Sequence, residues 1–115
     1  ENPSLLTKSA KPQIEEYLEG KRKTFDLPLK IKGTDFQKRV WNAIYTVKYG
    51  ETITYKDIGE MIGSKGYQAI GSACGKNPLP IVVPCHRILG KDNLGGFSSG
   101  MDIKIRLLKL ENILQ

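Results

Sequence analysis

The sequence predicts a small, mainly α-helical domain that includes a helix-turn-helix-like pair and a short extended segment ending at Cys85. Two observations lead to this fold class. Apolar residues recur three and four positions apart over most of the chain, as on one face of a helix. Residues that cap helices precede these runs, and glycine or proline follows them. The 115 residues suffice for one domain, and no apolar run approaches the length that spans a bilayer.

The first element is a predicted helix over residues 4–20, although Pro12 should kink or split it. Residues 21–33 read as an extended linker. We therefore expect two parts in the chain: an N-terminal helix and linker in residues 1–30, and the functional domain in residues 31–115.

The next predicted helix, in residues 34–50, has the strongest signal in the sequence. Thr34 and Gln37 have the spacing of a capping box, in which each side chain bonds the other residue's backbone N–H. Gly50 ends the run. The side chains expected to face the core recur at helical intervals: Phe36, Val40, Trp41, Ile44 and Val47.

Two shorter helices follow, joined by a glycine turn. Thr54 can cap the first of them, with Asp57 at its third position. The side chains of this helix that are expected to face inward are Ile58, Met61 and Ile62. The second helix runs through YQAIGSACGK and ends before Asn77 and Pro78. Such a pair matches the helix-turn-helix pattern, although many small helical proteins contain one without binding DNA.

The second of these short helices is rich in small residues, namely Gly66, Ala69, Gly71, Ser72 and Ala73. Such a composition has poor helix propensity, and a protein accepts this cost where another backbone must come close. The narrow minor groove of DNA would require such a slim helix. The net charge of +6 also favours a polyanionic partner, although a merely soluble basic surface would carry the same charge.

The run LPIVVP, residues 79–84, reads as an extended segment that is buried on both sides and leads to Cys85. A stretch with the composition of a flexible loop follows in residues 89–100. Residues 101–113 then close the chain as a helix. Its buried side is expected to hold Met101, Ile105, Leu107 and Leu108.

Cys85 is followed directly by His86, the single histidine of the chain. A lone buried cysteine is usually a small packing residue, and a histidine is often satisfied by backbone groups. If the pair is catalytic instead, a water must relay the proton, because adjacent residues point in different directions. A third group must then fix the imidazole tautomer, and Glu111 is the candidate. The alternative for Glu111 is a solvated charge near a helix end.

Three segments resemble the O6-alkylguanine-DNA alkyltransferase family, the methylated-DNA–protein-cysteine methyltransferases: NPLPIVVPCHRILG, GETITYKDIGEMIG and GGFSSGMDIKIRLLKLE. The Pro-Cys-His-Arg core at its distance from Asn-Pro is their most specific part. The resemblance covers about residues 13–113. It implies a winged helix-turn-helix-like DNA-binding domain that repairs DNA by direct damage reversal. In that reaction the alkyl group of O6-alkylguanine moves irreversibly to Cys85, once per protein molecule.

The resemblance also implies roles for individual catalytic residues. His86 would act on Cys85 through water, and Glu111 would orient His86. Asn77 would brace the turn behind the site. Tyr55 would press on the target phosphate and donate a proton to guanine as it leaves.

Further residues are implied to contact the substrate or the DNA. The main-chain carbonyls of Val83 and Cys85 would read the guanine amino group, while Ser98 would lie near O6. Lys104 would steady the loop that carries Ser98. The residues implied to contact DNA are Tyr55, Tyr67, Gln68 and Gly71.

Three departures from the family pattern limit what the resemblance implies. Gln68 stands where the family usually has an arginine that fills the gap left by the flipped base, and the neighbouring Tyr67 could assist it. Phe97 replaces a common tyrosine of the binding loop, so it keeps a stacking face and loses a hydroxyl. Most members also carry an N-terminal domain, which has a zinc site in some relatives, and no metal is expected here.

We expect a monomer without a cofactor, bound to double-stranded DNA through the minor groove with the alkylated guanine flipped out. Cys74 and Cys85 read as reduced thiols, and no secretory signal is evident, so we expect a cytoplasmic protein, or a nuclear one in a eukaryote. Three alternatives stay open: a non-enzymatic alkylguanine sensor, a cysteine hydrolase and a plain helix-turn-helix regulator. Cys85 argues against the sensor, because alkyltransferase-like proteins typically replace it.

Overall fold

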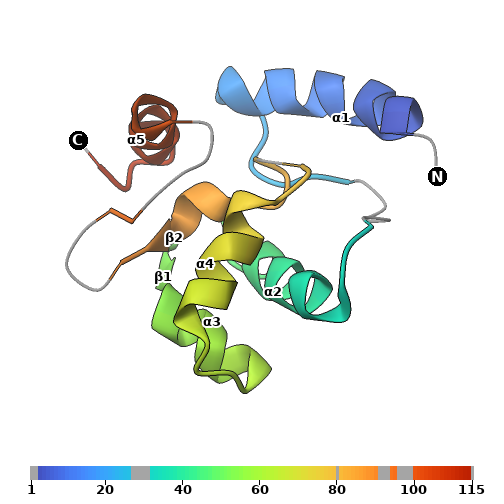
Figure 1. The fold of residues 1–115 in the computed structure, drawn as a ribbon. Coiled ribbons are helices and arrows are strands. Elements are labelled where there is room, and N and C mark those ends of the chain that lie inside the picture. Colours follow the sequence, from blue (N-terminus) through green and yellow to red (C-terminus); the bar gives the residue numbers. More distant parts are fainter. Residues whose placement is uncertain (1–2, 27–31, 80, 91–93, 96–99, 115) are drawn as a thin grey trace.

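The computed structural model describes residues 3–26, 32–79, 81–90, 94–95 and 100–114, and helices make up most of them (Figure 1). The elements in chain order are α1 (Pro3–Leu18), α2 (Asp35–Tyr45), β1 (Ile53–Thr54), α3 (Tyr55–Ile62), α4 (Tyr67–Gly75), the 3-10 turn η1 (Cys85–Arg87), β2 (Ile88–Leu89) and α5 (Met101–Leu110). The mainly α fold class is therefore confirmed. None of the helices in these ranges is both long and apolar enough to cross a membrane.

Local signals in the sequence define where α2 and α3 begin. The Thr34 hydroxyl accepts the Gln37 N–H at 3.0 Å, and the Gln37 side chain accepts the Thr34 N–H at 3.0 Å. The same reciprocal pair joins Thr54 and Asp57 at the start of α3. Both predicted caps are thus confirmed. Gly63 ends α3 with a φ of 71°, a left-handed conformation that favours glycine.

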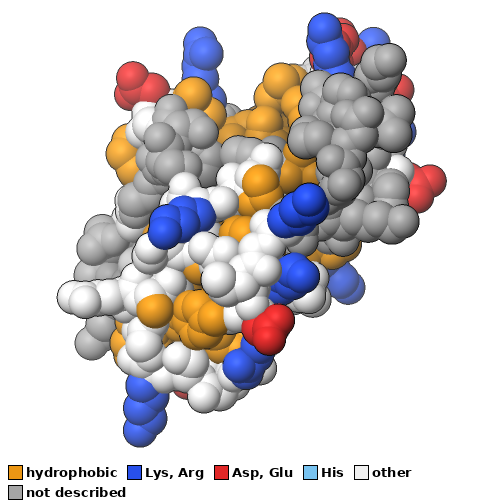
Figure 2. Space-filling view, turned by 45° about the vertical axis from the view of Figure 1, so that its right-hand side comes forward, with side chains coloured by type: hydrophobic (Ala, Val, Ile, Leu, Met, Phe, Trp, Pro, Cys, Tyr) orange, Lys and Arg blue, Asp and Glu red, His pale blue; other side chains and the backbone are white. Residues whose placement is uncertain are grey.

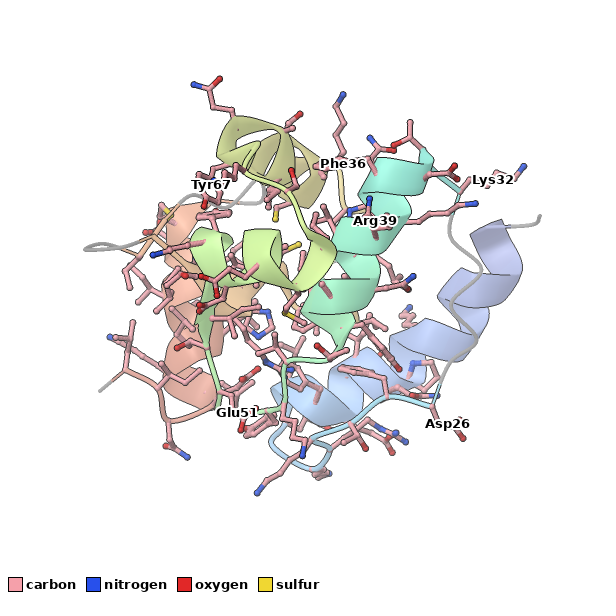
Figure 3. The ribbon with its side chains drawn as sticks, turned by 90° about the horizontal axis from the view of Figure 1, so that it is seen from below. Asp26, Lys32, Phe36, Arg39, Glu51 and Tyr67 are labelled. Atoms are coloured by element: carbon pink, nitrogen blue, oxygen red, sulfur yellow. The ribbon has the colours of Figure 1, made fainter. Side chains whose placement is uncertain are left out.

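The apolar core lies between α2, α3 and α4. Its members are Val40, Trp41, Ala43, Ile44, Ile58, Ile62, Ile70, Ala73, Cys74, Val83, Cys85 and Ile88. The Trp41 indole N–H donates to the Ala73 carbonyl at 2.8 Å, which joins α2 to α4. Arg39 reaches from α2 to the carbonyl of Ile62 at the end of α3 (Figure 3). Met61 was expected in this core but is 53% exposed, because the short helix turns this side chain to the solvent side.

The extended segment before Cys85 is the main difference from the expected fold. Ile81 has a φ of 77°, and residues 81–82 form a turn in which the Val83 N–H donates to the Leu79 carbonyl at 3.0 Å. Prolines on either side of this run lack the N–H that a ladder needs. Val82 and Val83 are nevertheless buried, as expected. The strand that pairs, β2, follows the cysteine and runs parallel to β1.

The N-terminal segment folds back on itself and packs on the site. α1 continues past Pro12 without a break. The Gln13 side chain bonds both backbone groups of Asp26, donating to the carbonyl at 3.0 Å and accepting the N–H at 2.8 Å. Phe25 then lies 5.6 Å from the Tyr17 ring, measured between centroids. Residues 21–26 are therefore held against α1 by specific contacts.

Helix α5 lies beside this N-terminal layer in the upper part of Figure 1. Leu107 and Leu108 are buried as expected, and Ile105 is half-buried. Met101 was expected on the buried side but lies at the exposed first position of the helix. The helix ends at Leu110, so Glu111 caps it and points into the protein.

Candidate active site

The Cys85 thiol is buried at the start of η1, with 6% of the residue exposed. The Asn77 amide donates to its sulfur at 3.0 Å and to the Val83 carbonyl at 2.7 Å. The Asn77 carbonyl oxygen in turn accepts the Leu79 N–H at 2.9 Å, which fixes the amide orientation. Asn77 therefore bridges the end of α4 to the cysteine turn and presents a donor to the sulfur.

The environment of Cys85 favours its thiolate. A hydrogen bond from the Cys74 side chain lowers the pKa of the Cys85 thiol, and it acts against burial, which raises it. The Asn77 amide and the charge of Lys104 lower this pKa further. Cys74, 8% exposed, carries the opposite shift, because its own pKa is raised by the bond to Cys85 and by burial. The sequence interpretation treated Cys74 as a packing residue, and no motif indicated this contact.

Glu111 lies at the centre of a second, entirely buried group of polar side chains. Its Oε2 atom is 2.6 Å from His86 Nε2 and accepts Arg87 Nη2 at 2.9 Å. Its Oε1 atom accepts Arg87 Nε at 2.8 Å and the backbone N–H of Gly50 at 3.0 Å. The hydroxyl of Tyr17 also donates to Oε2. The sequence indicated the contact with His86 but not those with Tyr17, Gly50 or Arg87.

These contacts determine the charge states of the site. Burial would raise the pKa of Glu111, but hydrogen bonds from His86, Arg87, Tyr17 and Gly50 outweigh it and lower the pKa to about 2. Burial lowers the pKa of His86, against the raising effect of Glu111. At neutral pH the site therefore holds a carboxylate next to a neutral imidazole.

A neutral imidazole has one N–H and one bare nitrogen. Because Nε2 faces the Glu111 carboxylate, the proton belongs on Nε2, and Nδ1 is left as the acceptor. His86 Nδ1 is buried and has no hydrogen-bond partner in the part of the chain that the structure describes. No bond joins the His86 ring directly to the Cys85 sulfur, since Nε2 is engaged by Tyr17 and Glu111. Nδ1 is therefore the basic nitrogen of the ring that no described residue engages.

The residues expected to contact DNA lie on α3 and α4. Thr54, Tyr55, Lys56 and Tyr67 line a hollow of about 540 Å³. Tyr67 is 43% exposed at the start of α4 and lies against α3, where a Cβ atom at Gly59 would be only 2.8 Å from its ring (Figure 3). In Figure 2, Lys and Arg side chains border apolar patches on this part of the surface.

The remaining predicted site residues differ in their burial and in their contacts. Gln68 is exposed and Gly71 is half-exposed on α4. Lys104 is fully buried, and its ammonium group donates to the Ile88 carbonyl at 2.6 Å. The Val83 carbonyl already accepts Asn77 and the Cys85 N–H, which occupies both of its lone pairs. Phe97 and Ser98 lie outside the described residues.

Across the described ranges, no three His, Cys, Asp or Glu side chains are grouped so that they could hold a metal ion.

A buried thiol with a lowered pKa, next to a histidine with a free nitrogen, defines a cysteine-dependent enzyme built on a small helical domain. Residues 35–113 match the family model described as 6-O-methylguanine DNA methyltransferase, DNA binding domain. The chain belongs to this family.

Named relatives agree with this assignment. The chain is 50% identical to the methylated-DNA–protein-cysteine methyltransferase of Methanosarcina barkeri, over 96% of the chain and 71% of the relative. It is 48% identical to the constitutive enzyme of Bacillus subtilis, over 98% of the chain and 69% of that protein. The crystal structure of Mycobacterium tuberculosis OGT in complex with DNA superposes with a TM-score of 0.87 at 42% identity, covering 92% of the chain and 67% of that protein. The chain thus spans about two thirds of the length of these relatives.

Proposed function

We propose that this chain repairs alkylated DNA by transferring the alkyl group from guanine O6 to Cys85, irreversibly and once per protein molecule. The observation that carries the proposal is the buried Cys85 sulfur, which accepts the Asn77 amide at 3.0 Å in surroundings that lower the pKa of the thiol. A thiolate is the form that attacks carbon, so this environment prepares Cys85 as a nucleophile. Membership of a family whose relatives are named for transfer to a cysteine agrees with this chemistry.

In the proposed step, Cys85 loses its proton through a water to Nδ1 of His86. The sulfur then forms a bond to the alkyl carbon as the bond from that carbon to guanine O6 breaks. The electron pair of the broken bond leaves with the base. Tyr55 donates a proton to the departing guanine, which balances the proton taken up by His86. Glu111 holds the His86 proton on Nε2, so that Nδ1 is the atom that accepts.

The α3–α4 pair is proposed to act as a helix-turn-helix that binds duplex DNA through the minor groove and flips the alkylated base toward Cys85. A Cβ atom added at Gly71 or Gly75 would meet nothing within 4 Å, so packing inside the protein does not require these glycines. Close approach of a DNA backbone would explain them. Tyr55, Tyr67 and Gln68 surround the proposed entry. The net charge of +6 supports binding to phosphates.

The oligomeric state and the cellular compartment of the protein are also part of the proposal. The protein is proposed to act as a monomer where DNA and reducing conditions coincide, in the cytoplasm or in the nucleus of a eukaryotic host. Both cysteines are free thiols, which agrees with a reducing compartment.

Mass spectrometry of the intact protein tests the proposal directly. After incubation with a duplex containing O6-methylguanine, the mass should increase by one CH₂ group, with the methyl group on Cys85. Cys85→Ala should remove the mass increase and retain DNA binding in a gel shift, and Cys74→Ala should still be methylated. DNA binding without any mass increase would instead make the protein a sensor, and methylation of Cys74 would overturn the assignment of the nucleophile.

A further inference from the structure

Tyr17 joins the active site from outside the region that the family model matches. It lies on α1, whereas the match begins at residue 35. The side chain is fully buried, and its hydroxyl donates to Oε2 of Glu111. The same hydroxyl oxygen is 3.3 Å from Nε2 of His86. A residue of the N-terminal helix therefore contacts both members of the pair that controls the proton of the site.

The donors around Glu111 restrict where the His86 proton can be. A carboxylate offers about four acceptor positions. Arg87 and Gly50 fill those at Oε1, while Arg87, Tyr17 and His86 meet at Oε2. The single hydroxyl proton of Tyr17 goes to the carboxylate, so only the oxygen lone pairs of Tyr17 face the imidazole. Both neighbours of Nε2 are then acceptors, and a bare Nε2 at 2.6 Å from a carboxylate oxygen would be repelled.

The contacts of the Tyr17 ring hold the hydroxyl in place. Phe25 lies 5.6 Å from its centroid, Tyr49 contacts it edge-on at 5.9 Å, and His86 lies at 6.3 Å. The residues that hold Phe25 are those of the fold-back, where Gln13 bonds both backbone groups of Asp26. The N-terminal segment therefore positions one hydroxyl between the Glu111 carboxylate, to which it donates, and the His86 ring.

We propose that Tyr17 is a positioning residue for the transfer reaction, which fixes the Glu111 carboxylate so that the His86 proton stays on Nε2 and Nδ1 accepts the proton of Cys85. The inference rests on the proposed function for its catalytic meaning. The tautomer and the basicity of His86 that it predicts do not depend on that function.

The charges around His86 determine in which direction its pKa should shift when the Tyr17 hydroxyl is removed. Glu111 attracts a proton to the ring, whereas Arg87 and Lys104 repel it; Tyr17 and Tyr49 are neutral. The hydrogen bond from Tyr17 withdraws negative charge from Glu111. Without that bond the carboxylate attracts the imidazolium more strongly, so the pKa of His86 should rise and more of the ring should be protonated below neutral pH.

The experiment compares Tyr17→Phe with Tyr49→Phe. Tyr49 is a matched control, because its hydroxyl donates to the Leu110 carbonyl at 3.1 Å and makes no recorded bond to Glu111. ¹⁵N-resolved NMR of labelled imidazole reports on His86 alone, since the chain has one histidine. Wild type should show the tautomer with its proton on Nε2. Tyr17→Phe should raise the His86 pKa, and Tyr49→Phe should leave it unchanged.

Single-turnover rates of methyl transfer as a function of pH provide the second measurement. At pH 6, Tyr17→Phe should be slower than wild type by about threefold to tenfold, with the difference closing at pH 8, since a tenfold change corresponds to one pH unit in the midpoint. A merely structural role would slow both tyrosine variants at every pH. Equal His86 titration in both variants would overturn the inference. A wild type that never acquires a methyl group would overturn the proposed function, while the NMR comparison would still test Tyr17.

Discussion

The apolar core and the polar cluster around Glu111 are built in opposite ways. The core gathers residues from three consecutive helices and from the segment around Cys85, and its members share one property: they are buried and form apolar contacts. The cluster joins segments as far apart as Tyr17 and Glu111, which are 94 residues apart, and each member has a specific bond. Core residues can be exchanged for others of similar volume at modest cost. In the polar cluster, loss of one partner leaves another buried group unsatisfied.

The substitution Glu111→Gln should give the largest difference between the polar cluster and the rest of the molecule. Arg87 is 5% exposed and bonds both carboxylate oxygens, so removing the charge leaves a buried guanidinium without its counter-ion. The free energy of unfolding in urea at pH 7 should fall by about 3–5 kcal/mol. Glu51→Gln is the surface control, and its effect should stay within about 0.5 kcal/mol. Equal effects of the two variants would mean that the cluster contributes no more than a surface charge.

The pH dependence of stability should separate the two regions. The lowered pKa of Glu111 stabilises the fold above its ordinary value of 4.5, and this contribution is lost as the pH falls toward about 2. The lowered pKa of His86 acts in the same direction, because below 6.5 the unfolded chain binds a proton that the folded one does not. For Glu111 alone the loss is about 3 kcal/mol.

Ile44→Val is the control from the apolar core, where Ile44 is fully buried. It should lower stability by about 1 kcal/mol at every pH and leave the acid dependence parallel to that of wild type. Glu111→Gln should flatten the part of the curve between pH 4.5 and 2. Unfolding curves in urea across this range provide the measurement. A flattened curve for Ile44→Val would show that the two regions are not independent.

A smaller effect, on the reactivity of a thiol, is expected at Cys74 and Cys85, two members of the apolar core. Cys74→Ala removes the hydrogen bond that lowers the pKa of the Cys85 thiol, so this pKa should rise and alkylation by iodoacetamide at pH 7 should slow by about threefold to tenfold. Cys74→Ser retains a donor and should stay closer to wild type. The same slowing in both variants would show that Cys74 acts on Cys85 only through packing.

The smallest effect is expected on the exposed face of α4, which belongs to neither region. Gln68→Arg introduces a flat, charged group that can fill the gap left by a flipped base and meet phosphates. Repair of duplex substrate should become faster by about threefold, while repair of single-stranded DNA or the free alkylguanine base should change little and stability should be unchanged. Single-turnover rates on the three substrates provide the measurement. Equal acceleration on all three would mean that residue 68 acts through general electrostatics.

The sequence predicted the apolar region better than the polar one, for a physical reason. Helix caps such as Thr34 and Thr54 act over three residues, so a local pattern suffices to place them. The residues around Cys85 made Cys85, His86 and Glu111 candidates for a catalytic group, and the resemblance supplied the role expected of each. Contacts such as that of Tyr17 depend on how distant segments meet, and no periodicity records this.

Among the local predictions that failed, two show that composition alone did not determine conformation or exposure. The apolar run before Cys85 resembled a buried strand, but Ile81 adopts a left-handed conformation and the run turns. Met61 fits the helical spacing of the core, yet α3 is only eight residues long and exposes it. For Val82 and Val83 hydrophobicity indicated burial but not conformation, because both are buried although residues 81–82 form a turn, whereas for Met61 it did not indicate burial either.

The bond from Asn77 to the Cys85 sulfur has a consequence for the protein after its single reaction. The Cys85 sulfur accepts the Asn77 amide in a setting that favours a negative charge on it, and such a charge would in turn favour the ammonium form of the buried Lys104. Alkylation turns this sulfur into a neutral thioether, which is a weak acceptor, and adds volume where only 6% of the residue is exposed. Lys104 then lacks the negative charge that favours its ammonium form. We therefore expect the alkylated protein to have a lower free energy of unfolding than the unused one, a difference by which the two forms could be told apart.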